Sequence, residues 1–162
     1  MLNFSQLLAA LGAAVHIDTA AAVADGGCTL SFDGKLEVTF ELSKDERSVY
    51  VFAPVLALPP SGNARETVLQ TLLQIHLFGM ATNGCYFGLD PKLSRVILFK
   101  TLALDHLDDK SALASIELLV NDLERWQKAL LDLVVRLQGN PTNVKNVANP
   151  ADPMSMLMSQ RA

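Results

Sequence analysis

The sequence predicts an α+β fold, with an antiparallel twisted sheet of about five strands and three helices in the order α-β-β-β-α-β-β-α. Residues 28–42 alternate between apolar and polar side chains, which is typical of strands with one buried and one solvated face. Asp33-Gly34 interrupts this alternation and is a strong hairpin signal. Three other stretches carry apolar residues at helical spacing. With 162 residues, of which 50% are hydrophobic, the chain can form one domain with its own core.

The first helix is expected near residues 3–12, where Phe4 and several leucines recur at helical spacing. Gly12 can end this helix in a left-handed cap. No positive region precedes the apolar run, which argues against a secretory signal. The glycine pair before Cys28 then favours a loop that leads into the first strand.

A third strand is expected in "VYVFAPVLAL", after the hairpin. Val49, Val51 and Ala53 can continue the core face of the sheet, which leaves Tyr50 and Phe52 on the opposite face. The neighbouring strands show Thr and Glu on that face. The two aromatic side chains therefore need either a covering element of the chain or a binding partner.

A second helix is expected over residues 63–80, with Asn63 as its cap and Glu66 completing a capping box. Its apolar residues spread far wider than the ~100° stripe of a helix that lies on one surface. One flank can pack on the sheet, and the other needs a second surface. In a chain of this size, an identical subunit is the economical candidate.

The end of the chain is expected to hold a second hairpin, a long helix and a tail. The hairpin strands are Cys85–Leu89 and Leu93–Thr101, and the helix begins near Asp108 or Asp109 and runs to residue 137. Asp122 and Arg125 are assigned to the solvated face of this helix. Residues 138–162 are rich in Asn and Pro and lack periodicity. We expect a single domain over 1–137 and a flexible tail over 138–162.

The sequence contains no grouping that points to catalysis, a metal or a cofactor. No nucleophile elbow, metalloprotease helix or phosphate-binding glycine loop is present. His16, His76 and His106 have no carboxylate or cysteine at ligand spacing, and Cys28 and Cys85 are best interpreted as small buried hydrophobes. The formal charge of −4 without a basic stripe argues against nucleic acid, and no apolar run is long enough to span a membrane.

Four stretches carry a resemblance to a known family, and together they span about residues 2–137. They are "FSQLLAALGAAV", "GGCTLSFDGKLEVTFEL", "TVLQTLLQIHLFGMATNGCYFGLDPKLSRVILFKTLALDHLD" and "NDLERWQKAL". Their order and spacing resemble the type III secretion chaperones of the CesT/Tir-chaperone family. In that comparison they correspond to the opening helix, the first hairpin, the dimerisation helix with its following hairpin, and the closing helix.

The resemblance implies a small acidic homodimer in the bacterial cytoplasm that is neither an enzyme nor a user of ATP or other cofactors. Such a chaperone would bind the N-terminal chaperone-binding region of one or more secreted virulence effectors. It would keep that segment extended and deliver it to the export apparatus, with the secretion ATPase as a further partner. Nucleic acid binding and membrane insertion are not expected.

Two sets of site residues follow from this resemblance and from the expected strand faces. The expected dimer interface comprises Val68, Leu72, Ile75, Phe78, Cys85 and Phe87. The expected effector-binding residues are Phe4, Leu8, Tyr50, Phe52, Ile97 and Phe99. A shift of strand register by one residue would exchange the two faces of a strand.

Two alternatives remain open at this stage. One is a dimeric thioesterase of the hot-dog fold, for which Glu66 is the one acid near the expected central helix. The other is an orphan protein-interaction domain that shares the chaperone fold without a role in secretion. Capture of an effector through its N-terminal region separates the chaperone from both.

Overall fold

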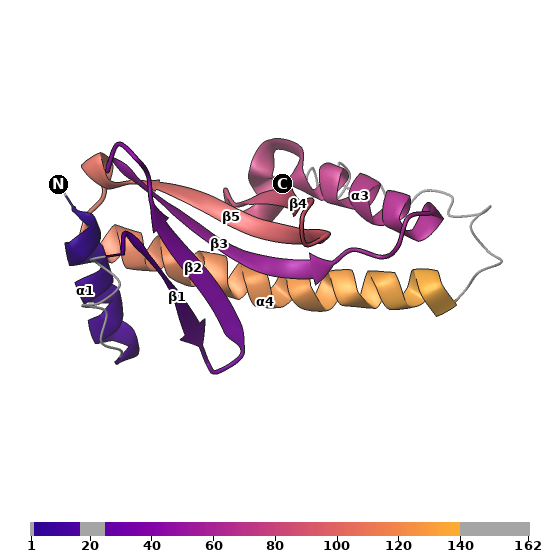
Figure 1. Cartoon of the computed structure of the whole chain (residues 1–162), viewed down its shortest axis with the longest axis horizontal. Helices are drawn as coiled ribbons and strands as arrows, with labels where there is room; N and C mark the ends of the chain where they lie inside the picture. The colour runs from indigo at the N-terminus through magenta and orange to yellow at the C-terminus, as the bar shows by residue number, and fades with distance from the viewer. Residues whose placement is uncertain (1, 17–24, 140–162) are drawn as a thin grey trace, which may run out of the picture.

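The computed structural model describes residues 2–16 and 25–139, and Figure 1 shows the arrangement of the chain. The elements are α1 (Phe4–Val15), β1 (Gly27–Phe32), β2 (Leu36–Leu42), β3 (Ser48–Ala57), α3 (Asn63–His76), the 3-10 turn η1 (Leu77–Thr82), β4 (Tyr86–Asp90), β5 (Arg95–Ala103), the short turn η2 (Leu104–His106) and α4 (Asp109–Gly139). Within the described residues, this confirms the predicted α+β class with five strands and three α-helices.

The five strands form one antiparallel sheet in the order β1-β2-β3-β5-β4. The first hairpin pairs Phe32 with Leu36 next to the turn at Asp33-Gly34, as the alternation predicts. The second hairpin joins the sheet through β5, which pairs with β3 from Ser48 to Ala57. The register shifts between Pro54 and Leu56, so β3 is irregular near its end. β1 and β4 are the two edge strands.

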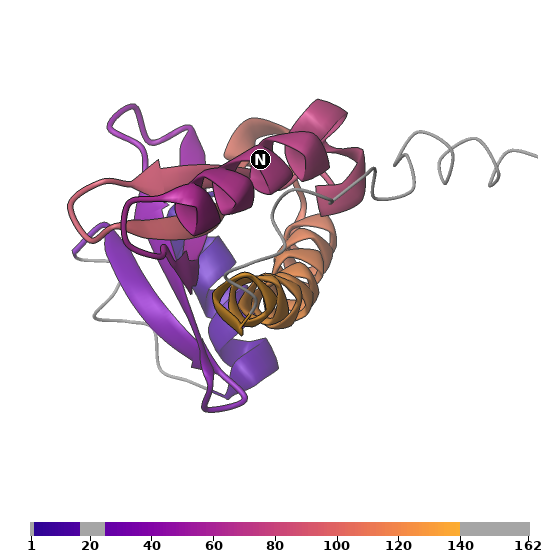
Figure 2. The same cartoon turned by 90° about the vertical axis from the view of Figure 1, so that its right-hand side faces the viewer.

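One face of the sheet carries the core. α4 packs against β2, β3 and β5, and α1 lies beside α4 (Figures 1 and 2). The sheet contributes Phe40, Val51 and Leu98 to this core, and the helices contribute Leu7, Leu119 and Leu123, none of which is more than 1% exposed. No described helix covers the opposite face (Figure 2). The expectation of one buried and one open face is therefore met.

The first helix is longer than expected. Asn3 caps its start by accepting a hydrogen bond from the Gln6 backbone, and the Gln6 side chain accepts one from the Asn3 backbone. Gly12 is buried inside the helix and does not end it. The left-handed cap is supplied by His16, with φ 59°, after Val15. Burial of Gly12 among the core residues therefore outweighs its weak helix preference.

The second helix differs from its prediction at both ends. Gly62 is the N-cap residue, Asn63 is the first helical residue, and no side chain caps the helix, so the capping box of Asn63 and Glu66 is not formed. The helix ends at His76 and not near residue 80. Phe78 and Gly79, which lie inside η1, both have positive φ and turn the chain away from the axis of α3.

The final helix begins where the sequence predicts. The Asp108 side chain accepts a hydrogen bond of 2.7 Å from the Ser111 backbone N–H and so caps the helix. The helix then continues to Gly139, two residues past the expected domain end at 137. The remainder of the predicted tail, residues 140–162, lies outside the described residues. In the described part of the chain, no helix has the length and hydropathy needed to cross a membrane.

Candidate interaction surfaces

The open face of the sheet carries a row of aromatic side chains across three strands. In the strand register Phe52 of β3 lies opposite Phe99 of β5, and Phe99 lies opposite Tyr86 of β4. The ring centroids of Tyr86 and Phe99 are 5.7 Å apart. Phe52, Phe99 and Tyr86 are called the aromatic row below. On the side toward β1, the row continues into Thr39 and Thr29, whose hydroxyl oxygens are 2.9 Å apart.

Two further predicted residues lie on the same face as the aromatic row. Tyr50 is 44% exposed on β3, and Ile97 on β5 lies opposite Gly88 of β4. A Cβ atom at Gly88 would lie only 3.2 Å from Ile97 Cγ1 and 3.3 Å from Phe99 Cε1. The absence of a side chain at Gly88 therefore lets Ile97 and Phe99 lie over β4. The structure thus brings together Tyr50, Phe52, Ile97 and Phe99, the four strand residues predicted to bind a client.

The two helical residues of the predicted client site lie elsewhere. Phe4 is 6% exposed and Leu8 is 0% exposed, both within the core that α1 forms with its neighbours. Direct contact of these two side chains with a client does not fit that burial. Helical spacing predicted their shared face correctly, but it does not say whether that face meets the chain's own core or a partner.

A second apolar surface lies on α3, η1 and β4. Its exposed members are Leu73 (72%), Leu77 (58%), Phe78 (81%), Met80 (56%), Tyr86 (45%) and Leu89 (48%), and together they are called the α3–β4 surface below. Tyr86 belongs both to this surface and to the aromatic row, and its ring lies 5.2 Å from that of His76. Large exposed apolar patches of this kind mark interaction sites.

The predicted dimer residues divide into two groups around this surface. Phe78 is part of it, and Ile75 and Phe87 are partly buried beside it. Val68, Leu72 and Cys85 are at most 4% exposed and support the surface from within the chain. The predicted dimer interface stays a prediction. The exposed residues Leu73, Leu77, Met80 and Leu89 belong to this surface but not to the predicted set.

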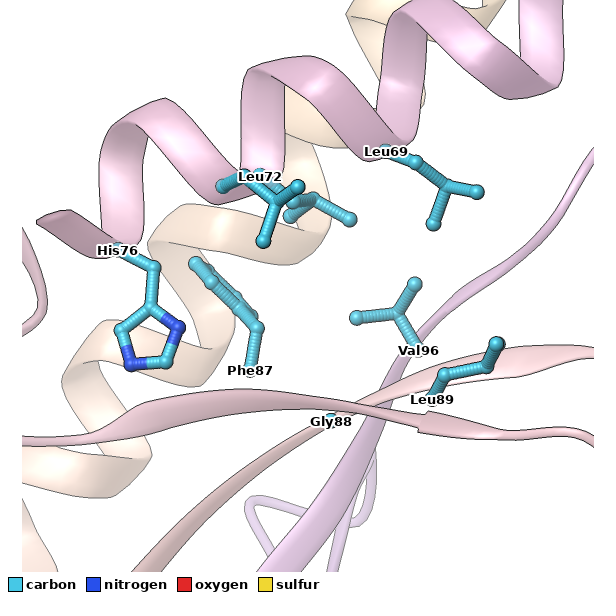
Figure 3. Close-up of a pocket in the computed structure, with 8 residues that line it drawn as sticks. Leu69, Leu72, His76, Phe87, Gly88, Leu89 and Val96 are labelled. Carbon is cyan, nitrogen blue, oxygen red and sulfur yellow. The ribbon is translucent and has the colours of Figure 1, made fainter.

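A hollow of about 230 Å³ opens between α3 and β4. Leu69, Leu72, Leu73 and His76 line it from the helix, and Phe87, Gly88, Leu89 and Val96 line it from the strands (Figure 3). The lining side chains are apolar except that of His76, and Gly88 has no side chain. Phe87 also packs edge-on against Trp126 of α4, with ring centroids 5.7 Å apart.

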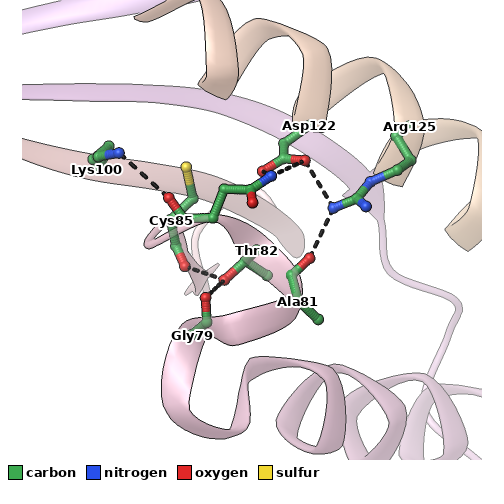
Figure 4. Close-up of polar contacts among 8 residues, drawn as sticks. Gly79, Ala81, Thr82, Cys85, Lys100, Asp122 and Arg125 are labelled. Carbon is green, nitrogen blue, oxygen red and sulfur yellow. Dashed lines mark hydrogen bonds and ion pairs between the residues drawn. The ribbon is translucent and has the colours of Figure 1, made fainter. Parts of the chain in front are cut away.

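A group of polar contacts fastens η1 to α4 (Figure 4). Asn83 Nδ2 donates to both carboxylate oxygens of Asp122, at 3.1 and 2.9 Å. Arg125 Nη2 is 2.7 Å from Asp122 Oδ1 and donates to the Ala81 carbonyl at 2.7 Å. The Lys100 ammonium lies 3.4 Å from the Asn83 carbonyl oxygen. The contacts among Ala81, Asn83, Asp122 and Arg125 are called the polar clamp below.

The polar clamp corrects one assignment made from the sequence. Asp122 was placed on the solvated face of the final helix, but it is only 4% exposed. Burial of a carboxylate is unfavourable unless it is paired and hydrogen-bonded, and Asn83 and Arg125 supply those partners. The helical pattern cannot reveal this arrangement, because Asn83 lies 39 residues away in the sequence.

The ionisable groups give no sign of a reactive site. Burial raises the pKa of the Cys85 thiol and that of the Cys28 thiol, which keeps both in the less nucleophilic protonated form. Within residues 2–16 and 25–139, no three acidic, histidine or cysteine side chains are grouped so that they could hold a metal ion. The features that stand out are apolar surfaces suited to contact with another chain.

Several solved structures share this fold. The ExsC–ExsE complex matches with a TM-score of 0.64 and 21% identity, over 77% of this chain and 91% of that chain. The HopA1–SchA chaperone–effector complex matches with a TM-score of 0.59 and 14% identity, over 77% and 93%. The Yersinia pestis type III secretion chaperone SycH, in complex with a fragment of YscM2, matches with a TM-score of 0.52 and 14% identity, over 75% and 98%.

These likenesses establish the fold, while the family follows from the sequence itself. No significant match was found among curated protein sequences. The sequence profile of the Tir chaperone protein (CesT) family, however, matches residues 6–127, from α1 into the middle of α4. The match contains every strand of the sheet and both apolar surfaces. The chain therefore belongs to the Tir chaperone protein (CesT) family, as its sequence predicts.

Proposed function

We propose that this protein is a bacterial type III secretion chaperone that holds an extended segment of a secreted effector on the open face of its sheet. The observation that carries the proposal is the aromatic row on a sheet face that no described helix covers, in a chain of the CesT family. Solved chains of the same fold include a chaperone–effector complex. The client is proposed to be the N-terminal chaperone-binding region of an effector.

The structure supplies two physical means of holding such a segment. Apolar side chains of the client can pack on Phe52 and Phe99, which are already ordered by their strands. Main-chain hydrogen bonds can form along β1, because this edge strand has an unpaired side and lies at the opposite edge of the sheet from β4. Ordering a disordered segment costs free energy, so the contact should exceed the roughly 1,600 Å² of a standard interface.

The protein is also proposed to be a homodimer that uses the α3–β4 surface. With about 200 Å² for a large side chain, its six exposed members offer roughly 700 Å² per chain. A standard interface buries about 800 Å² on each partner, so the surface has the size that a stable dimer requires. Its place at one edge of the sheet leaves most of the open face free for the client.

Further properties of the proposed chaperone concern its chemistry and location. We propose that it acts in the cytoplasm without catalysis or a cofactor and passes its client to the export apparatus, with the secretion ATPase as a candidate partner. The raised thiol pKa values of Cys28 and Cys85 support a non-catalytic role. The hot-dog thioesterase is not supported, because α3 lies beside the β4 edge rather than inside a wrapped sheet. Glu66 lies exposed at the start of α3.

The proposal is tested by capture of the client with matched variants. The tagged chain is expressed in a bacterium with an active type III secretion system, and bound proteins are digested and identified by mass spectrometry. We expect a protected fragment from the N-terminal region of a secreted protein, and reduced export of that protein when the chaperone is deleted. Phe52→Thr with Phe99→Thr should lose the fragment, because Thr preserves strand preference but removes the apolar contact.

The control for this experiment is Leu118→Thr, which changes a 46% exposed leucine on α4 far from the aromatic row. It should retain the fragment. A client that is captured equally well by the double variant would place the binding site elsewhere. A bound protein whose export does not depend on the chaperone would favour the orphan interaction domain.

A further inference from the structure

We propose that Phe78 is an anchor that inserts into the α3–β4 hollow of a second copy of this chain, and that the polar clamp holds it in position. This inference rests on the proposed homodimer and adds to it the residue that each copy contributes to the other. It follows from the backbone conformation at Phe78, from the clamp at the end of its turn, and from the apolar hollow between α3 and β4.

The conformation of Phe78 is the first observation. Its φ of 61° and ψ of 6° lie in the left-handed region, which a bulky residue rarely adopts. Its side chain is also 81% exposed, so no contact within the chain compensates for that conformation. Such outliers persist where the surrounding structure enforces them and where they serve a function. An exposed aromatic residue held in this way is typical of a binding anchor.

The polar clamp fixes the end of the turn that carries Phe78. Asn83, itself left-handed with φ 49°, ends η1 and binds the buried Asp122. Arg125 binds the Ala81 carbonyl from the same helix, so two points of η1 are fixed to α4. The Thr82 hydroxyl donates a hydrogen bond to the Cys85 carbonyl. The same hydroxyl lies 3.2 Å from the Gly79 carbonyl oxygen. The end of η1 is therefore held against α4. This restrains the turn that carries Phe78 and reduces the entropy lost on binding.

The hollow between α3 and β4 supplies a receptor of the right size and polarity. Its volume is about 230 Å³, whereas a dry apolar cavity of about 150 Å³ is enough to hold benzene. Apolar side chains that line an open hollow lack packing contacts on the side that faces solvent. A phenyl ring would restore them and would cover the hollow's exposed rim at Leu73 and Leu89.

Twofold symmetry places Phe78 of one copy near the hollow of the other. In such an interface, residue i contacts residue j and residue j contacts residue i. If the axis passes near Leu73, the most exposed leucine of α3, the two helices run antiparallel. His76, the last residue of α3, then lies opposite position 70. The turn that carries Phe78 therefore begins next to Leu69, which lines the hollow. The interface so formed uses the whole α3–β4 surface. Its exposed area of roughly 700 Å² per chain approaches the ~800 Å² that each partner buries in a standard interface.

The test measures the dimer dissociation constant by analytical ultracentrifugation on the full chain. Phe78→Ala should weaken the dimer by at least about 30-fold, as expected for a hot-spot aromatic residue. Leu118→Ala, an exposed position on α4, is the control and should leave the constant unchanged. Leu69→Trp, which fills the hollow from within, should also weaken the dimer. In the Phe78→Ala background, Leu69→Trp should have little further effect.

The role of the clamp has its own readout. Asn83→Gly keeps the left-handed backbone at no steric cost but removes the hydrogen bonds to Asp122. Asn83→Gly alone should weaken the dimer. When Asn83→Gly is combined with Phe78→Ala, the dimer should be no weaker than with Phe78→Ala alone. A general loss of stability would weaken both equally, and would overturn the positioning role.

The outcomes separate this inference from the proposed function. A dimer whose constant is unchanged by both Phe78→Ala and Leu69→Trp would overturn the anchor while leaving the homodimer in place. A chain that is monomeric at all concentrations would overturn the homodimer and the anchor together, but not client capture. If the Phe78→Ala variant still forms the dimer but no longer captures the client, Phe78 binds the client. That result would overturn the proposal that Phe78 inserts into a second copy of the chain.

Discussion

At the level of single residues, the open face of the sheet depends on a position that has no side chain. Gly88 lies in β4 opposite Ile97, and the space above it is taken by Ile97 and Phe99. These two side chains belong to the proposed client site. A residue with no contact of its own to a client can therefore determine the shape of the surface that the client meets.

Gly88→Ala is expected to weaken client binding with little effect on stability. The new Cβ would lie 3.2 Å from Ile97 Cγ1 and 3.3 Å from Phe99 Cε1, so both side chains must move by a few tenths of an ångström. Replacement of glycine within a strand gains back roughly 0.5–1 kcal/mol, which offsets that strain. We expect a several-fold higher dissociation constant for the captured client segment, measured by fluorescence anisotropy, and a nearly unchanged melting temperature.

Gly139→Ala is the matched control, because nothing lies within 4 Å of a Cβ at that position. It should leave client affinity unchanged. Equal affinity of the Gly88→Ala variant and the unchanged chain would show that the client does not contact Ile97 or Phe99.

The sequence predicted the faces of strand residues but not the burial of Asp122. The alternation of β3 and β5 correctly placed Tyr50, Phe52, Ile97 and Phe99 together, because the face of a strand residue follows from its position in the strand. The burial of Asp122 was missed, because its partner Asn83 is brought to it by the fold.

At the level of elements, helix ends are decided by local caps in some places and by packing in others. α4 begins at the residue after Asp108, whose carboxylate accepts the Ser111 N–H, and the sequence predicted this start. The ends of α1 and α3 were predicted less well. Gly12 remains helical because it is buried. α3 stops at His76 because the backbone leaves the helical conformation at Phe78 and Gly79.

The cap at Asp108 predicts a pH dependence of stability. Hydrogen bonds from the Ser111 backbone and side chain lower the pKa of Asp108 below its usual value. A lowered folded-state pKa means that the contribution to stability is present above the unfolded pKa of about 4 and is lost as the pH falls through the folded value. The melting temperature of Asp108→Ala should therefore lie below that of the unchanged chain at pH 7, and the difference should disappear in acid.

Thermal denaturation followed by circular dichroism between pH 2.5 and 7 measures this difference. Asp25→Ala, a change at an exposed residue before β1, serves as the control. A melting-temperature difference for Asp108→Ala that persists unchanged to pH 2.5 would contradict the cap as its cause.

At the level of the whole molecule, the sheet separates a face that packs against α4 from an open face that we propose to hold the client. Leu98 of β5 is fully buried under α4, while its neighbour Phe99 points to the open face. The two roles therefore alternate residue by residue along the same strand. Changes on one side should affect stability, and changes on the other should affect binding.

A pair of leucine substitutions tests this division. Leu98→Ala should lower the free energy of unfolding by about 2–5 kcal/mol, the usual cost of removing a buried leucine side chain. Leu93→Ala, at a leucine that is 62% exposed in the hairpin loop, should change it by less than about 0.5 kcal/mol. Urea denaturation followed by tryptophan fluorescence measures both. Similar losses for the two variants would contradict the assignment of the core to the α4 side.

The sequence by itself determined the fold class, the order of the elements, the faces of the strands and the family of this protein. Each of these depends on periodicity or on local signals such as Asp33-Gly34, which neighbouring residues carry. Only the tertiary structure decided that Phe4 and Leu8 lie in the core, that Asp122 is buried, and that Phe78 is held out in solvent. These outcomes depend on contacts between segments distant in the sequence, because a side chain's burial is set by what the fold packs against it.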